Sequence, residues 1–141
     1  MSDITAPLSN TVIKKVTHLC DKGDAAFDAH EFVQAIEHYK AALDALPEPF
    51  IEYEISTFLT AGIGDAYFYL GKYEDALSFF DIALVTPDGL GNPFVQLRLG
   101  QCYLEVGDLA KAKTALTKAY DLEGESLFAD DDPKYWAFLG K

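Results

Sequence analysis

The pattern of apolar and polar positions indicates helix along most of the chain, with short interruptions that contain proline, glycine or polar residues. We expect helices at about residues 10–29, 31–46, 49–70, 72–85, 93–106, 109–123 and 132–139. Ser9 or Asn10 is expected to cap the first helix, and Pro47 to stop the second. Asp132 and Pro133 suit the N-cap and the first helical position of the last helix.

The segment PDGLGNPF, residues 87–94, allows two interpretations, a glycine-rich loop that binds phosphate or a turn between two helices. Pro87 is expected to end one helix, and Gly89 and Gly91 to supply left-handed or tight turn conformations. Asn92 is expected to cap the next helix, which Pro93 begins. A phosphate-binding loop would need a preceding buried strand and usually Lys, Ser or Thr at its helix end, and the segment has neither. We interpret it as a turn between helices.

One arrangement of small and bulky residues occurs three times. Each copy has an alanine, a bulky residue four positions later, a second alanine three positions after that, and a glycine twelve residues before the first alanine. A break between the glycine and the first alanine makes each copy a helix-turn-helix unit. Small residues at fixed positions allow two helices to approach closely where they cross. The copies are Gly23-Ala35-Tyr39-Ala42, Gly64-Ala76-Phe80-Ala83 and Gly100-Ala112-Leu116-Ala119.

The repeated arrangement resembles the tetratricopeptide repeat (TPR) over about residues 16–122. The first copy is degenerate, with Ala26 in place of the family's tyrosine and His30 in place of the turn glycine. The best match is the second copy, through Gly64, Tyr67, Gly71, Tyr73, Ala76, Phe80, Ala83 and Pro87. The third copy matches nearly as well, through Leu99, Gly100, Tyr103, Gly107, Ala112 and Ala119.

The resemblance implies an all-α fold, in which three TPR-like helix-turn-helix repeats form a right-handed superhelix with a short C-terminal capping helix. We expect a flexible N-terminus at residues 1–9 and a single domain at residues 10–141. Within the domain, the expected repeats and cap are 16–47, 57–87, 93–122 and 130–139. The helix expected at 49–70 is longer than the family norm, which would explain why the first two copies are 41 residues apart and the next two only 36.

The resemblance also implies a concave groove lined by the first helix of each repeat. Its register places aromatic and acidic side chains there and no lysine, a combination that suits a protein interface. The alternative is that several of the aromatic residues pack beneath the long third helix or the C-terminal helix. Family proteins that bind acidic chaperone tails use a set of Lys, Asn and Arg residues of which only Arg98 is present, so we expect no such carboxylate clamp. The candidate partner-binding residues are Asp24, Phe27, Asp28, Phe58, Asp65, Phe68, Tyr69, Phe94, Leu97, Arg98, Gln101, Leu104 and Glu105, and the same register includes Thr17, Cys20 and Ala61.

Composition narrows the possible partners. The chain has 141 residues, of which half are hydrophobic, enough for one domain with its own core. Its 23 acidic and 11 basic residues give a formal net charge of -12, which repels nucleic acids and anionic membranes and favours a basic protein partner. The N-terminal residues lack the features of a signal peptide, and no apolar run reaches the ~18 residues of a membrane span. With Cys20 and Cys102 expected as buried, reduced thiols, these features predict a cytoplasmic protein.

Candidate catalytic and metal-binding residues are sparse. The three histidines are His18, His30 and His38, and the last two lie about two helical turns apart, too far to share a metal ion. The acidic residues at 123–132 lack the order of a calcium-binding loop. We expect them and the aromatic residues at 135–138 to cap the final repeat. The sequence therefore predicts a non-catalytic protein without a metal or cofactor.

Residues 62–139 are also similar to small bacterial repeat proteins that are often associated with secreted polymorphic toxins. That resemblance implies an immunity protein that neutralises a toxin, and many such toxins are nucleases with basic sites. The alternative is a secretion-system chaperone or adaptor that holds an effector segment in the concave groove. A third hypothesis is a small hydrolase that uses Asp130 to Asp132.

Overall fold

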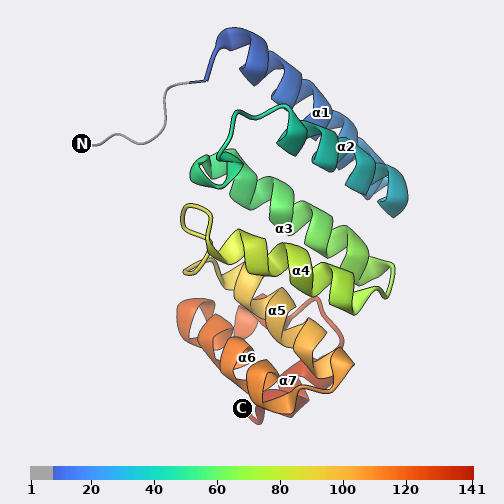
Figure 1. Cartoon of the computed structure of the whole chain (residues 1–141). Coiled ribbons are helices and arrows are strands. Elements are labelled where there is room, and N and C mark those ends of the chain that lie inside the picture. The colour runs from blue at the N-terminus through green and yellow to red at the C-terminus, as the bar shows by residue number, and fades with distance from the viewer. Residues whose placement is uncertain (1–7) are drawn as a thin grey trace, which may run out of the picture.

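The computed structural model describes residues 8–141, which contain seven α-helices, two short 3-10 helices and no β-strand. The α-helices form three antiparallel pairs stacked along one axis, with a short helix at the C-terminal end of the stack (Figure 1). This arrangement confirms the predicted all-α repeat fold. Residues 1–7 of the predicted flexible N-terminus lie outside the described part of the chain. The helices are α1 (Asn10–Asp28), α2 (Phe32–Asp44), α3 (Glu54–Tyr69), α4 (Tyr73–Leu84), α5 (Pro93–Val106), α6 (Leu109–Glu123) and α7 (Pro133–Leu139), with 3-10 helices at Phe50–Glu52 and Glu125–Phe128.

The helices of each pair cross where the repeated glycine of one faces the bulky residue of the other. A methyl group added at Gly64 would lie 2.8 Å from the ring of Phe80, and one at Gly100 would lie 2.5 Å from Leu116 Cγ. The flanking alanines allow the same close approach, because all six are fully buried. The sequence signature therefore marks the helix crossings, as predicted. These alanines are Ala35, Ala42, Ala76, Ala83, Ala112 and Ala119.

The helix ends follow the expected capping residues in most places. The Ser9 hydroxyl accepts a hydrogen bond from the backbone N–H of Val12, and the Asn92 side chain accepts from two N–H groups in the first turn of α5. Asp132 accepts from the N–H of Lys134 and caps α7. His30 adopts a φ of 61°, the left-handed conformation for which the family uses glycine at this turn.

Two local predictions were wrong. The third helix begins at Glu54 rather than near residue 49, because a 3-10 helix occupies Phe50–Glu52. In the turn between α4 and α5, Asp88 takes the left-handed conformation instead of the glycines. Gly89 is required there for space, since a methyl group would lie 1.7 Å from the carbonyl oxygen of Ala83.

Both cysteines are buried and unpaired by disulfides, as the sequence predicted. Burial is the main cause that raises the pKa of Cys20 to about 11 and that of Cys102 to about 12. The two thiols are therefore protonated at neutral pH and act as small apolar side chains in the core.

Candidate binding groove

A groove of about 710 Å³ opens on the concave side of the first two helix pairs. It lies between α1 and α3, and the turn that leads into α5 closes one end. The Thr57 hydroxyl donates to the backbone carbonyl of Pro87 at 2.7 Å and so ties this turn to α3. The groove is lined by Asp24, Phe27, Asp28, Tyr39, Glu54, Thr57, Phe58, Ala61, Gly62, Asp65, Pro87, Asp88, Asn92 and Phe94.

The lining combines aromatic rings with carboxylates. Its five acidic side chains come from α1, α3 and the turn before α5, and it includes no lysine or arginine. Phe58 is 48% exposed, a large fraction for an apolar ring. Such a surface can bury apolar side chains and attract cations, and it would repel anionic groups.

Tyr39 forms part of the groove floor from the second helix of the first pair. Its ring is buried beneath Gly23 and Gly62, and its hydroxyl donates to Asp24 Oδ1 at 2.6 Å. Burial, together with the hydrogen bond to Asp24, raises the pKa of Tyr39 above its ordinary value. The tyrosine therefore stays protonated and keeps one carboxylate oxygen of Asp24 in place.

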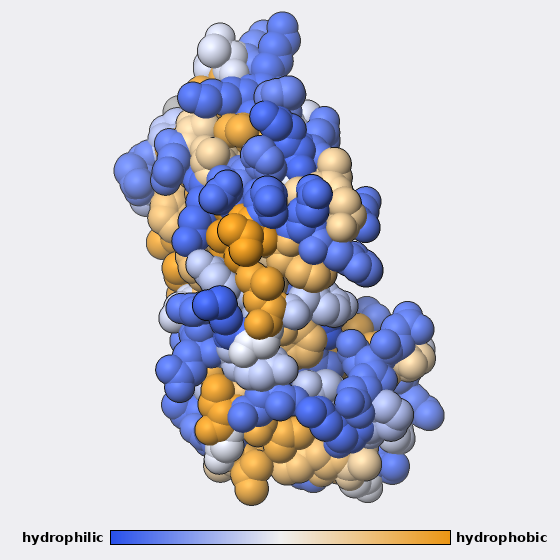
Figure 2. Space-filling model, turned by 90° about the vertical axis from the view of Figure 1, so that its right-hand side faces the viewer, coloured by the Kyte–Doolittle hydropathy of each residue, from blue (hydrophilic) through white to orange (hydrophobic). Residues whose placement is uncertain are grey.

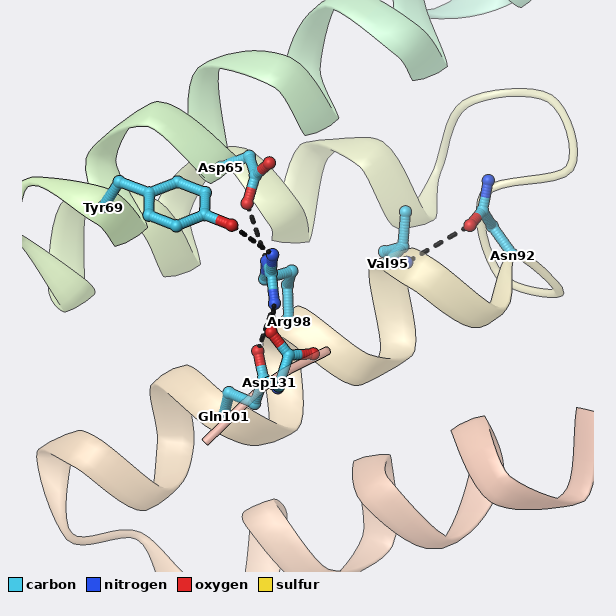
Figure 3. Close-up of polar contacts among 7 residues, drawn as sticks. All are labelled: Asp65, Tyr69, Asn92, Val95, Arg98, Gln101 and Asp131. Carbon is cyan, nitrogen blue, oxygen red and sulfur yellow. Dashed lines mark hydrogen bonds and ion pairs between the residues drawn. The ribbon is translucent and has the colours of Figure 1, made fainter. Parts of the chain in front are cut away.

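Arg98 on α5 lies at the centre of a buried polar network at the edge of the groove (Figure 3). Its guanidinium donates to Asp65 at 2.6 Å and to Asp131, in the segment before α7, at 3.1 Å. It also donates to the side-chain oxygen of Gln101 at 2.7 Å and to the Tyr69 hydroxyl at 3.2 Å. Burial alone would lower the pKa of Arg98, but the two carboxylates outweigh it and raise the pKa. The one cation among the predicted groove residues is thus neutralised by the protein's own acids.

The third-repeat part of the concave face is covered by the C-terminal segment. Leu97 packs in a buried cluster with Phe128 and Leu139, and Gln101 is fully buried. Glu105 accepts a hydrogen bond from the Tyr135 hydroxyl at 2.6 Å and pairs with Lys134, whose Nζ lies 2.6 Å from the same carboxylate oxygen. This region of the face cannot contact a partner unless the cap moves.

Phe68 and Tyr69 belong to a different surface. With Phe27 and Phe32 they form a chain of ring contacts, with centroids 5.2 to 5.8 Å apart, that links the turns of the first two helix pairs. Figure 2 shows hydrophobic side chains gathered near the middle of the face that carries these turns, with hydrophilic residues around them. The guanidinium of Arg98 also stacks on Phe68, 4.5 Å from the ring centroid.

The structure therefore divides the predicted site residues into two groups, with Leu104 in neither. Those in the covered part of the concave face or the ring contacts are Phe68, Tyr69, Leu97, Arg98, Gln101 and Glu105, and Leu104 is partly buried outside the groove lining. Those that line the open groove are Asp24, Phe27, Asp28, Phe58, Asp65 and Phe94. Register along the first helices could not reveal Tyr39, Asp88 or Asp131, because these residues come from a second helix, a turn and the cap.

Two other kinds of site were sought among the described residues. Within residues 8–141, no group of three or more His, Cys, Asp or Glu side chains lies close enough together to hold a metal ion. Over the same range, no helix combines the length and the apolar character that crossing a membrane requires. The fold and the groove thus define a helical-repeat protein with a concave, acidic and aromatic surface.

Comparisons with known proteins identify the kind of repeat. The tetratricopeptide repeat family model matches residues 62–126. PcrH from Pseudomonas aeruginosa has a similar structure, with a TM-score of 0.70 at 22% identity over 94% of this chain and 92% of that one. The Yersinia enterocolitica type III secretion chaperone SycD, in complex with a peptide of the translocator YopD, gives 0.69 at 16% identity over 94% and 92%. The first TPR domain of Spaghetti (RPAP3), bound to an HSP90 peptide, gives 0.69 at 21% identity over 89% and 88%.

Residues 62–126 match the tetratricopeptide repeat family, and the chain as a whole has the fold of tetratricopeptide repeat domains. The family match begins within α3 and continues through α4, α5 and α6, and the structural similarity extends the same fold over the first pair. No curated protein sequence matches the chain at a significant level. The predicted resemblance to the tetratricopeptide repeat and the predicted fold are confirmed.

Proposed function

We propose that this protein is a non-catalytic module that binds an extended segment of a basic partner protein in the groove between α1 and α3. The observation that carries the proposal is a groove of about 710 Å³ whose lining has aromatic rings, of which Phe58 is 48% exposed, five acidic side chains and no basic side chain. Aromatic residues are enriched among the few residues that carry most of the binding energy in protein interfaces, and the acids would favour a cationic partner.

The particular role that this groove supports best is that of a secretion-system chaperone or adaptor. SycD is described in complex with a peptide of YopD, and PcrH in complex with the chaperone binding region of PopD. Both share the fold of this chain, although their sequences are distant. The groove of this chain lies on the concave face, is open to solvent and has room for a linear segment.

A second role, that of an immunity protein for a secreted toxin, uses the same acidic character differently. This role stays a prediction from the resemblance of residues 62–139 to toxin-associated repeat proteins. A net charge of -12 suits binding to a basic toxin domain, and the protein would then cover the phosphate-binding site of that domain. In this role the partner would be a folded domain docked on an edge or on the outer face.

The two roles differ in what the partner presents, and hydrogen exchange can separate them. We would purify the protein with its partner from the native cell and compare exchange in the free and bound states. Protection in α1 and α3, reproduced by a linear peptide from the partner, supports the chaperone role. The immunity role is supported by three results together. The outer face is protected, only the folded partner binds, and the protein rescues cells from that partner's toxicity. A complex that protects no residue of the groove would contradict groove binding.

A further inference from the structure

Two carboxylates lie one helical turn apart on α1 and both line the open groove. Asp24 and Asp28 are four residues apart, so their side chains are neighbours on one face of the helix. Neither takes part in any ion pair within residues 8–141. Like charges at this spacing repel each other, and a cation bound between them would remove that cost.

Asp24 is also held in position by a rigid part of the core. The Tyr39 hydroxyl donates to Oδ1, and the Tyr39 ring is fixed because a methyl group at Gly23 would lie 2.5 Å from it. No described donor other than Tyr39 reaches this carboxylate. A charged group positioned before its ligand arrives loses little freedom on binding.

Aromatic rings flank these carboxylates. Phe27 lies between them in sequence on α1, Phe58 on α3 is 48% exposed, and Phe94 at the start of α5 completes the lining. Rings of this kind contact apolar side chains and also attract cations placed over their faces.

The chain itself shows how a cation fits such surroundings. The Arg98 guanidinium lies 4.5 Å from the centroid of Phe68 and 5.0 Å from that of Phe94, while it pairs with Asp65 and Asp131. The open groove offers the same two kinds of group, rings and carboxylates, and of its acidic side chains only Asp65 pairs with a cation within residues 8–141.

From these contacts we infer that the open groove is a receptor for an extended segment that carries a lysine or arginine side chain between apolar residues. Asp24 and Asp28 bind the cationic group, and Phe27, Phe58 and Phe94 contact the flanking apolar side chains. The inference rests on the proposed function and adds to it the chemistry of the bound segment and the residues that select it.

A random 12-residue peptide library displayed on phage tests this inference. Selections would use the wild-type protein, the variant Asp24→Asn with Asp28→Asn, and the control Glu74→Gln with Asp75→Asn, which removes two exposed charges outside the groove lining. The wild type and the control should enrich peptides with a basic residue between apolar ones. The groove variant should enrich apolar peptides without that basic residue.

A double-mutant cycle then measures the contact in solution. Replacing the basic residue of a selected, fluorescein-labelled peptide by norleucine should weaken its binding to the wild type by about tenfold or more. The same replacement should change binding to the Asp24→Asn, Asp28→Asn variant by less than about threefold. Asp28→Asn alone serves as a second variant in the same measurement. Asp28 is exposed, and its replacement leaves the hydrogen bond between Tyr39 and Asp24 intact.

The outcomes separate this inference from the function on which it rests. Wild-type enrichment of peptides without basic residues, or an equal norleucine effect on both proteins, overturns the cation receptor and leaves a peptide-binding groove. No enrichment by the wild type overturns peptide binding in the groove as well. Selected peptides that bind equally well to Phe58→Ser show that they occupy a different surface and also overturn the inference.

Discussion

At the scale of single residues, the carboxylates of the concave face fall into two states. Asp65 is mostly buried and paired with Arg98, and burial with the nearby Asp131 raises its pKa in spite of that pair. Asp24 receives only the hydrogen bond from Tyr39. The paired carboxylate of Asp65 stabilises the packing between α3, α5 and the cap, whereas the carboxylate of Asp24 remains free for a ligand.

Replacing Arg98 by methionine should destabilise the fold by about 3 kcal/mol, because it leaves Asp65 in a largely apolar site without its counter-ion. Urea unfolding measures the change, and Lys22→Met on the exposed side of α1 is the control for loss of a charge. Adding Asp65→Asn to Arg98→Met should recover part of the loss. Equal stabilities of Arg98→Met and the wild type would show that the network contributes nothing.

Replacing Ala76 by leucine should destabilise the fold by ~1–3 kcal/mol, because Ala76 is fully buried at the crossing of α3 and α4. Thermal and urea unfolding measure the effect. Ala25→Leu is the matched control, since Ala25 is exposed on α1 and its replacement should change stability by less than about 0.5 kcal/mol. If both variants melt like the wild type, the crossing is looser than the structure indicates.

At the scale of elements, the C-terminal cap is held by several separate contacts. Trp136, the single tryptophan, lies 5.2 Å from Phe128 and 5.8 Å from Tyr120 between ring centroids. Lys113 on α6 donates to the backbone carbonyl of Leu139 at 2.8 Å. These contacts join α7 to α6 and cover the end of the repeat stack, as solenoids require.

The cap contact at Glu105 should depend on pH. Burial alone would raise the pKa of Glu105, but hydrogen bonds from Lys134 and Tyr135 and the charge of Lys134 lower it overall. A carboxylate with a lowered folded-state pKa stabilises the fold above its unfolded pKa, and that stability is lost as pH falls through the folded value. Glu105 should therefore stabilise cap docking at neutral pH and cease to do so at a pH below 4.5.

Trp136 fluorescence during urea unfolding can measure this effect. The difference in stability between the wild type and Glu105→Gln should be constant from pH 7 to about 5 and should shrink toward zero as pH falls further. Asp121→Asn, at an exposed position on α6, serves as the control for loss of a carboxylate. A difference that stays the same down to pH 3 would contradict a lowered pKa for Glu105.

At the scale of the whole molecule, charge is distributed unevenly over the concave face. The third-repeat part contains Arg98, which Asp65 and Asp131 neutralise. The other four acidic side chains of the open groove make no ion pair within residues 8–141, and the groove lining has no basic side chain. The net charge of -12 adds a long-range attraction for basic partners. Long-range attraction mainly raises the association rate and is screened by salt.

The association rate with a basic partner should therefore fall as salt rises from about 0.05 to 0.5 M, because the screening length drops below ~10 Å. Stopped-flow mixing of the protein with its partner measures the rate. The variant Asp24→Asn with Asp28→Asn should show a shallower salt dependence than the wild type. A rate that does not change with salt would count against a basic partner.

The fold could be predicted from the sequence alone, because glycine and alanine at fixed spacing leave space that only a neighbouring helix can fill. The spacing marked Gly64 and Gly100 as points of close approach, and the structure packs them against Phe80 and Leu116. Where spacing gave no constraint, as in the segment before Glu54, the predicted helix start was wrong.

Only the tertiary structure decided which concave residues remain open. Helix register predicts the face on which a residue lies, but coverage depends on segments far along the chain. Asp131, from the cap, meets Arg98 although 33 residues separate them. The cap covers Leu97 and Gln101, while Phe58 and Asp24 remain in the groove. These outcomes follow from how the chain folds back on itself, which local spacing does not encode.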